Sequence, residues 1–443
     1  MAHKSKYNYF FEREDKSYGC YNTLTNSLVV FDKKTKEKFD EMSNTKIKID
    51  DEFKRKLLKL GFLCDDDNDE QLLVNLSRYR RAFLQKAAYF RILTTTGCNA
   101  RCSYCYEQGV ITKTMNLKTA DLVANFILEN SNVEKLYIHW FGGEPLLNEK
   151  VIDHIMKKIH SKLEGSSTKI YVYFTSNGSL LDKIDMKKIK ELWQPTWFQI
   201  TVDDIGEKYN KIKNYYNKTN NYTLVIKNIK RLLENNIPVN IRINYEPKEI
   251  QHTKEIISNL NLEFKSYLDE GSVTITPAAI FNTINTNEVK IRKGHNCQYM
   301  QLYNYSKENN YTIDNTPISL PFKGGQCFAC HQGSFIIDPY GDLYKCTLTI
   351  KDKNASVGNV KESVKLNKKY LSWINPELPT KCTNCKFLPF CQGGCKGGYL
   401  GYIDYMCNRI VPEINQVLER RIMEKVKNNS NDWLNSGNKI DLT

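Results

Sequence analysis

Long apolar runs are missing from this sequence of 443 residues. Its first residues, MAHKSKYNYFFERED, lack the apolar core of a signal peptide. No later stretch approaches the roughly 18 to 20 apolar residues that a membrane-spanning helix needs. We therefore expect a soluble, cytoplasmic protein with no membrane partner. The length is about three times that of a usual domain, so two or three domains are expected.

A concentrated basic patch is also missing, although the formal net charge is +14. The basic residues are spread among Asn and Tyr, as in KYNKIKNYYNKTNN at 208–221. A nucleic-acid-binding protein usually gathers its positive charge on one face or along one helix. We therefore expect a mildly basic, solvated surface and no nucleic-acid partner.

Cysteine is abundant, with 14 residues, and its distribution is uneven. In a reducing compartment disulfides are poor candidates, and clustered cysteines favour metal binding or redox chemistry. Three cysteines lie within CNARCSYC at 98–105, and eight more lie between 327 and 407. We interpret the isolated Cys20, Cys64 and Cys297 as ordinary thiols.

The first 87 residues read as a small separate module. The segment at 17–32, SYGCYNTLTNSLVVFD, has two apolar runs around Asn and Thr, which predicts a hairpin. The segment at 50–61, DDEFKRKLLKLG, has helical spacing and a glycine at its end. A further helix should include Leu72, Leu73, Leu76 and Phe83. Together with a Lys-rich segment near 34–42, these elements predict a winged-helix-like domain.

From 88 to 290 apolar strands alternate with amphipathic helices, which predicts an α/β fold with a parallel sheet. Six such units suit a partial (β/α)6 barrel like that of the TIM fold, with its chemistry at the carboxyl ends of the strands. The expected strands are YFRILTT (89–95), LYIHWF (136–141), IYVYFTS (170–176), FQITVD (198–203), VNIRINY (239–245) and VTITP (273–277).

Beyond residue 290 the alternation stops. Residues 291–410 are rich in cysteine, and we expect a loop-rich domain folded around metal. Residues 411–443 should form a terminal helix and a polar tail. The apolar stripe of that helix is interpreted as packing surface; it consists of Ile414, Val417, Leu418, Ile422 and Val426.

The spacing Cys98-x3-Cys102-x2-Cys105 supplies three thiolates in a loop after the first barrel strand. Structural zinc and iron–sulfur clusters both usually take four protein ligands. A cluster with three thiolates leaves one iron open to a small molecule. With Tyr104 before the last cysteine, the loop resembles the radical S-adenosylmethionine (SAM) superfamily. That resemblance implies a [4Fe–4S] cluster that binds SAM and cleaves it to a 5′-deoxyadenosyl radical; zinc or a purely structural role are the alternatives.

Three later segments resemble SAM-binding parts of the same family. FGGEP at 141–145 implies contacts from the backbone of Gly142 and Gly143 and from the Glu144 carboxylate to the methionine ammonium. FTSNG and QITVDD resemble segments that line the ribose and substrate cleft, which implies roles for Asn177 and Thr201. The chain has Asp204 where the family often has glycine. A plain turn or strand-end cap is the alternative for each segment.

The carboxyl-terminal cysteines resemble the SPASM extension of radical SAM enzymes, which holds two auxiliary [4Fe–4S] clusters. The resemblance implies one cluster on Cys327, Cys330, Cys346 and Cys395, with Cys297 as an alternative to Cys327. The second cluster would use Cys382, Cys385, Cys391 and Cys407. A pair of zinc ribbons is the rival interpretation for these cysteines.

SPASM-bearing enzymes mostly modify peptides, so the resemblance implies a maturase that cross-links a ribosomally made precursor peptide, with a thioether favoured. The amino-terminal module would bind the precursor's leader by strand addition, and an unrelated cap or a dimerisation module is the alternative. The electrons would come from a flavodoxin or ferredoxin type of reductant. An anaerobic sulfatase-maturing enzyme is the alternative, and a zinc-stapled nucleic-acid-binding protein is a more distant one. No catalytic base can be named: Asp203, Asp204 and the acids of the SPASM loops are candidates, and a route without a base is the alternative.

Overall fold

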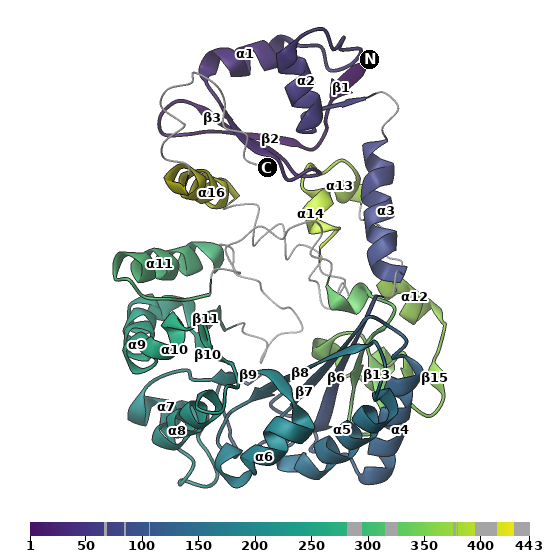
Figure 1. Ribbon diagram of the computed structural model, residues 1–443, viewed down its shortest axis with the longest axis vertical. Helices are drawn as coiled ribbons and strands as arrows, with labels where there is room; N and C mark the ends of the chain where they lie inside the picture. Colours follow the sequence, from purple (N-terminus) through teal and green to yellow (C-terminus); the bar gives the residue numbers. More distant parts are fainter. Residues whose placement is uncertain are drawn as a thin grey trace.

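The computed structural model describes residues 1–65, 69–83, 86–105, 107–280, 295–314, 327–374, 378, 380–394 and 414–428. The amino-terminal module lies at one end and a large sheet with its helices at the other, and the helix α3 runs between them (Figure 1). Within these ranges no helix is both long and apolar enough to cross a membrane. Cys395 and Cys407 lie outside the described residues, as does the side chain of Cys297.

The amino-terminal module contains the predicted hairpin and helices, together with strands that the sequence analysis did not anticipate. A third strand joins the hairpin to give the antiparallel order β2-β3-β4, and a separate pair is formed by β1 and β5. On α3, Leu72, Leu73, Leu76 and Phe83 are exposed, while Val74 is buried. The elements are β1 (Ala2–Lys4), β2 (Asn8–Glu12), β3 (Tyr18–Asn22), β4 (Leu28–Phe31), α1 (Lys33–Glu41), α2 (Glu52–Lys59), β5 (Leu63–Asp65) and α3 (Glu70–Phe83).

The six predicted barrel strands are confirmed and pair in parallel in the order β11-β10-β9-β8-β7-β6. Their apolar residues, such as Ile138 and Trp140, are buried against the helices, while the alternate residues, such as His139 and Phe141, are half-buried on the other face. This open parallel sheet is the predicted partial barrel. Its strands are β6 (Ala87–Thr95), β7 (Lys135–Gly142), β8 (Lys169–Ser176), β9 (Pro195–Thr201), β10 (Val239–Tyr245) and β11 (Val273–Ala279).

Helices alternate with these strands, as βα units require. The helix α4 packs beside α5, and α8 packs beside α7. The helices are α4 (Leu117–Glu129), α5 (Glu149–Leu163), α6 (Met186–Lys188), α7 (Gly206–Lys213), α8 (Tyr222–Leu233), α9 (Ile250–Glu263), α10 (Lys265–Asp269) and α11 (His295–Glu308).

The cysteine-rich part contributes strands to the main sheet, which the sequence analysis missed. The strand β12 pairs in parallel with β6, and three short antiparallel strands follow it. All four residues of β12 are buried, so it lacks the alternation that reveals a half-buried strand. The elements are β12 (Ser334–Ile337), β13 (Asp342–Tyr344), β14 (Gly358–Asn359), β15 (Ser363–Val364), α12 (Lys368–Ile374), α13 (Thr380–Thr383) and α14 (Leu388–Cys391).

The terminal helix α16 (Ile414–Asn428) uses its apolar stripe for packing, as predicted. Ile414, Val417, Leu418 and Ile422 are buried in one cluster, and Val426 packs against its edge. The partners in that cluster come from the three-stranded sheet and from the α14 region: Phe11, Tyr21, Leu28, Phe387 and Phe390. The helix therefore joins the end of the chain to the amino-terminal module.

Candidate functional site

A cavity of about 500 Å³ lies at the carboxyl ends of the parallel strands. The loop after β6, the end of β7 and the ends of β8, β9 and β10 all contribute to its wall. Leu348, from the cysteine-rich part, also lines it. The structure therefore brings together most of the residues predicted from separate motifs. They are Cys98, Cys102, Tyr104, Cys105, Gly142, Gly143, Asn177 and Thr201.

Backbone hydrogen bonds to the segment that ends and follows α7 hold the three-cysteine loop in place. The backbone N–H of Arg101 donates to the Lys213 carbonyl at 2.8 Å, and the N–H of Tyr216 donates to the Asn99 carbonyl at 3.1 Å. A turn closes when the N–H of Cys105 donates to the Cys102 carbonyl at 3.1 Å. Backbone bonds thus fix the loop, and the three thiols remain at the cavity wall.

Burial makes Cys98 and Cys105 weaker acids. It raises the pKa of Cys98 to about 12, and the nearby Glu144 charge adds to the shift. It also raises the pKa of Cys105. Because a buried thiol resists ionisation, these side chains need a cationic centre to become thiolate ligands.

Gly142 and Gly143 allow the turn after β7 to touch the cysteine loop. A Cβ atom on Gly143 would lie 2.2 Å from the Gly97 carbonyl oxygen, and one on Gly142 would lie 2.1 Å from the Thr95 carbonyl oxygen. Gly142 also has a φ of +127°. The N–H of Gly143 donates to the Thr95 carbonyl at 3.1 Å. Only glycine fits at these two positions without moving the backbone.

Glu144 lies beneath the cavity, and it is not among the residues that line it. Its carboxylate accepts from the Asn177 N–H at 2.8 Å, the Ser176 hydroxyl at 2.9 Å and the Leu146 N–H at 3.1 Å. Burial nevertheless raises its pKa to about 7. The carboxylate that was expected to meet the SAM ammonium thus positions Asn177 in this structure.

Asn177 connects the end of β8 to the cysteine loop. Its side-chain amide donates to the Asn99 side chain at 2.8 Å and lies 3.9 Å from the Cys98 sulfur. The Asn99 amide in turn donates to the Ser179 hydroxyl at 2.9 Å. These bonds set the spacing between the loop and the cavity wall formed by β8.

Sequence analysis missed a buried charged group under Tyr104. The Lys213 ammonium, with its side chain 2% exposed, lies 2.7 Å from the Asp203 carboxylate and 3.3 Å from the Tyr104 hydroxyl. Burial alone would lower the pKa of Lys213, but Asp203 holds it well above its usual value. Asn244 donates to the same carboxylate through its backbone and side chain, at 3.1 and 3.0 Å. The Asp203 carboxylate is therefore engaged by the Lys213 ammonium and by two N–H groups of Asn244.

Asp204 is engaged in a different direction. Its carboxylate lies 2.8 Å from the Nε2 atom of His252 and accepts from the Ile205 N–H at 2.8 Å. Neither Asp203 nor Asp204 lines the cavity. Their geometry gives neither of these two carboxylates a direct path to a substrate there.

Polar side chains on the inner face of the sheet complete the wall. Gln199 and Thr201 extend from β9, and Arg242 and Asn244 extend from β10. A signal for them exists in the sequence, because these residues alternate with buried Phe198, Ile200, Ile241 and Ile243. Strand alternation therefore marks the polar residues that face the barrel interior.

The sulfurs of the three loop cysteines are not gathered as closely as the ligands of a single metal ion. In tetrahedral zinc sites the Zn–S distance is about 2.3 Å, so the sulfurs lie roughly 4 Å apart. Within the described residues, only one group of three or more metal-binding side chains has its ligand atoms within 4.8 Å of one another, and it contains none of these cysteines. Three thiols at one cavity wall are the number of side-chain ligands that a four-iron cluster with one open iron would take.

The next cysteines lie at one end of the β12-β13 hairpin. Cys327 and Cys330 precede β12 and are joined by a turn in which the Cys330 N–H donates to the Cys327 carbonyl at 2.9 Å. Cys346 follows β13. The buried Lys345 ammonium donates to the carbonyls of His331 and Ser334 at 2.6 and 2.7 Å. The hairpin therefore gathers three of the predicted ligands of the first auxiliary cluster.

Cys382, Cys385 and Cys391 occupy the short helices α13 and α14 and the turn between them. The Cys385 N–H donates to the Cys382 carbonyl at 3.2 Å, and the Leu388 N–H donates to the Cys385 carbonyl at 3.0 Å. Burial lowers the pKa of Arg78 on α3, while Cys330 and Cys382 act in the opposite direction. The helix α3 therefore passes near both cysteine groups.

Comparison with known proteins identifies the central part of the chain. Residues 92–259 match the family model described as the Radical SAM superfamily. GTP 3′,8-cyclase of Clostridium perfringens is 28% identical over 43% of this chain and 55% of its own. The chain thus spans about half the length of the first curated relatives it matches. The radical SAM cyclopropyl synthase TigE of Paramaledivibacter caminithermalis is 21% identical over 76% of this chain and 74% of its own.

Two solved structures share the fold over most of the chain. The anSMEcpe protein with bound AdoMet and the Kp18Cys peptide aligns with a TM-score of 0.60 and 17% identity, covering 77% of this chain and 99% of its own. Streptococcus suis SuiB bound to the precursor peptide SuiA aligns with a TM-score of 0.51 and 14% identity, covering 90% of this chain and 96% of its own. At these identities the likeness concerns the fold.

Proposed function

Because this chain contains a radical SAM domain at residues 92–259, we propose that the protein is a peptide maturase of the SPASM-bearing kind. Its substrate is a ribosomally made precursor peptide with a leader. A hydrogen atom is removed from one residue of that peptide, and the resulting carbon centre is joined to another atom of the same peptide. A peptide cysteine is the favoured second partner, which gives a thioether.

One observation carries the proposal. Side chains and glycines from four separate sequence segments meet in one cavity at the carboxyl ends of the strands, namely those of the cysteine loop, FGGEP, FTSNG and QITVDD. Active sites of barrel enzymes lie at this end of the sheet. The convergence supports assigning Cys98, Cys102 and Cys105 as the ligands of the SAM-binding cluster.

The remaining wall residues would bind and orient SAM. The close approach at Gly142 and Gly143 exposes backbone groups beside the cysteine loop, and Asn177 and Thr201 supply polar contacts. Lys213 places a positive charge under Tyr104, next to the cysteine loop. When bound, SAM and the three [4Fe–4S] clusters supply the one-electron chemistry, a hydrogen-abstracting 5′-deoxyadenosyl radical and an acceptor for the electron released on cross-linking.

The cysteine-rich part supports two auxiliary clusters. Cys327, Cys330 and Cys346 lie at one end of a hairpin, and Cys382, Cys385 and Cys391 lie on adjoining turns. Cys395 and Cys407 are proposed as the fourth ligands. Since Leu348, two residues after Cys346, lines the main cavity, the first of these sites adjoins the space proposed for the substrate.

The amino-terminal module is proposed to bind the leader. Its three-stranded sheet ends in the short edge strands β2 and β4. An extended peptide can add to such an edge through backbone hydrogen bonds. The shared fold with SuiB, whose structure contains the precursor peptide SuiA, supports a peptide as the substrate.

Formylglycine formation on a sulfatase is the second candidate. It is favoured by the alignment with anSMEcpe and by 20% identity with the cysteine-type anaerobic sulfatase-maturating enzyme of Clostridium novyi. The SuiB fold, however, covers 90% of this chain against 77% for anSMEcpe. This broader coverage supports the maturase with a leader-binding module.

Anaerobic reconstitution followed by reaction with candidate peptides tests the function. We expect about twelve irons per chain, four in each of three clusters, and formation of 5′-deoxyadenosine from SAM. A precursor encoded beside this gene should lose about 2 Da, because one hydrogen atom is abstracted and one thiol proton is released as the bond forms. Conversion of a sulfatase peptide to formylglycine, with no reaction on the precursor, would contradict the maturase assignment.

A further inference from the structure

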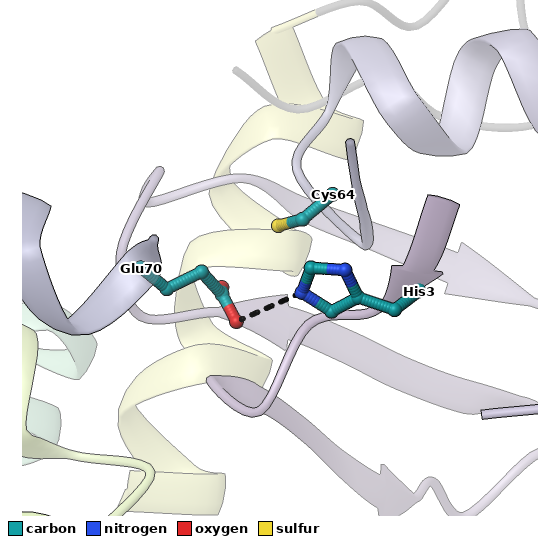
Figure 2. Close-up of side chains that lie close together, drawn as sticks. All are labelled: His3, Cys64 and Glu70. Carbon is teal, nitrogen blue, oxygen red and sulfur yellow. Dashed lines mark ion pairs between the residues drawn. The ribbon is translucent and has the colours of Figure 1, made fainter. Parts of the chain in front are cut away.

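A second group of metal-binding side chains lies in the amino-terminal module, far along the chain from the cysteine loop. His3, Cys64 and Glu70 each offer one ligand atom, and these atoms lie within 4.8 Å of one another. Figure 2 shows the three side chains pointing toward a common centre from β1, β5 and the first turn of α3. We propose that this trio is a zinc site, with a water molecule as the fourth ligand.

Strand register places two of the ligands. His3 and Cys64 are direct partners in the antiparallel β1-β5 pair, so their side chains project from the same face. Directly opposed residues have Cβ atoms about 5 Å apart. A thiolate and an imidazole at that separation can share one ion. The pairing of these two strands therefore builds half of the site before any metal arrives.

Glu70 is held in position by the chain segment that follows β1. The Ser5 hydroxyl donates to one carboxylate oxygen at 2.5 Å, and the Lys6 N–H donates to the other at 3.1 Å. The second oxygen also lies 3.9 Å from the Nε2 atom of His3. A carboxylate has about four acceptor positions, so these donors leave room for a metal bond. Bonds of this kind commonly orient carboxylate ligands in metal sites.

The donor set and its surroundings suit zinc. One sulfur, one imidazole nitrogen and one carboxylate oxygen are all zinc ligands, and three protein ligands leave an open position for water. Cys64 and Glu70 are buried, while the His3 side chain is 28% exposed, which gives solvent access. Burial and the neighbouring carboxylate raise the pKa of the Cys64 thiol to about 12. On binding, zinc would displace that thiol proton to solvent.

The site would fix the start of α3. Glu70 is the first residue of that helix, and the other two ligands belong to the strand pair of the module. Because α3 runs from this module toward the large sheet (Figure 1), zinc would set the direction in which the helix leaves the module. This zinc site is independent of the reaction proposed for the barrel.

The test uses the full protein after anaerobic assembly of its iron–sulfur clusters. The protein is equilibrated with about one equivalent of Zn²⁺ and desalted, and zinc and iron are counted per chain. Cys64→Ser and His3→Gln remove ligands. Cys20→Ser is the matched control, since Cys20 is a buried thiol on β3 of the same module and is not part of the trio. Zinc-edge X-ray absorption on the unaltered protein identifies the ligand atoms.

We expect about one zinc, bound to one sulfur and several nitrogen or oxygen atoms, in the unaltered protein and in Cys20→Ser. Cys64→Ser and His3→Gln should lose it with their iron content unchanged. Equal zinc in the unaltered protein and in His3→Gln would overturn the proposal, as would a spectrum with several sulfurs. The partly exposed His3 keeps the test decisive if Cys64→Ser fails to fold. Cleavage of SAM, measured in parallel, reports separately on the proposed function.

Discussion

Replacement of Gly143 by alanine tests the cavity most sharply. The new Cβ atom would lie 2.2 Å from the Gly97 carbonyl oxygen and 2.7 Å from that of Thr96. Ordinary contacts of this kind are longer than about 3.2 Å, so the turn must move by roughly 1 Å. A displacement of that size in an active site can lower the rate about a hundredfold.

The same movement weakens the bonds between the turn and the cysteine loop. The N–H groups of Gly143 and Glu144 donate to the carbonyls of Thr95 and Gly97 at 3.1 and 2.9 Å. With about 1 kcal/mol for each bond, the turn would lose roughly 2 kcal/mol. Because the three cysteines are unaltered, we expect the Gly143→Ala protein to keep its iron. Because the turn beside them is displaced, we expect its SAM cleavage to fall about a hundredfold.

The assay measures 5′-deoxyadenosine formed under reducing, oxygen-free conditions. Gly109→Ala is the control, because Gly109 has a φ of +79° but a Cβ atom there meets nothing within 4 Å. It adds backbone strain of about 1 kcal/mol near the same loop without a clash. If Gly143→Ala and Gly109→Ala both retained normal rates, the close approach at Gly143 would have no part in binding SAM.

Substitutions at Cys98, Lys213 and His252 test the cysteine loop and two buried or half-buried ion pairs. Cys98→Ala should abolish SAM cleavage and lower the iron content by about four per chain, and unchanged 5′-deoxyadenosine formation would refute its role. Lys213→Met should lower the free energy of unfolding by about 3 to 5 kcal/mol because it leaves Asp203 buried without its cation, and Lys213→Met with Asp203→Asn should recover part of that loss in denaturant unfolding. The hydrogen bond that the His252 imidazole donates to the Asp204 carboxylate raises the pKa of His252. The stability that this bond contributes is therefore complete below about pH 6.5 and is lost as the pH rises through the higher folded pKa. In His252→Gln the melting temperature should fall less between about pH 6 and pH 9 than in the unaltered protein.

The sheet could be predicted because its strands have a clear alternating pattern of apolar residues. Each of the six has buried β-branched or aromatic residues at alternate positions, and a helical pattern follows most of them. The strand β12 was not predicted because its four residues are all buried. The strands β1 and β5 were not predicted because each has only three residues. Short or wholly buried strands lack the two-residue alternation of apolar and polar residues that reveals a strand in a sequence.

The site was predictable where chemistry depends on a motif within one segment. Cys98, Gly143 and Asn177 each belong to such a motif, and the fold brings them to one cavity. The burial of Lys213 was not predicted because a lysine on a short helix is usually exposed. Only the fold places it in the interior against Asp203. The position of Glu144 beneath the cavity depends on three hydrogen-bond donors that no spacing reveals.

The proposed function requires an iron at the cavity wall that the protein leaves without a fourth side-chain ligand. Electron paramagnetic resonance of the reduced protein, recorded with and without SAM, tests this directly. We predict a [4Fe–4S] signal that changes when SAM is added and disappears in Cys98→Ala. A signal that SAM leaves unchanged, or a colourless protein with zinc bound by the same three cysteines, would contradict it.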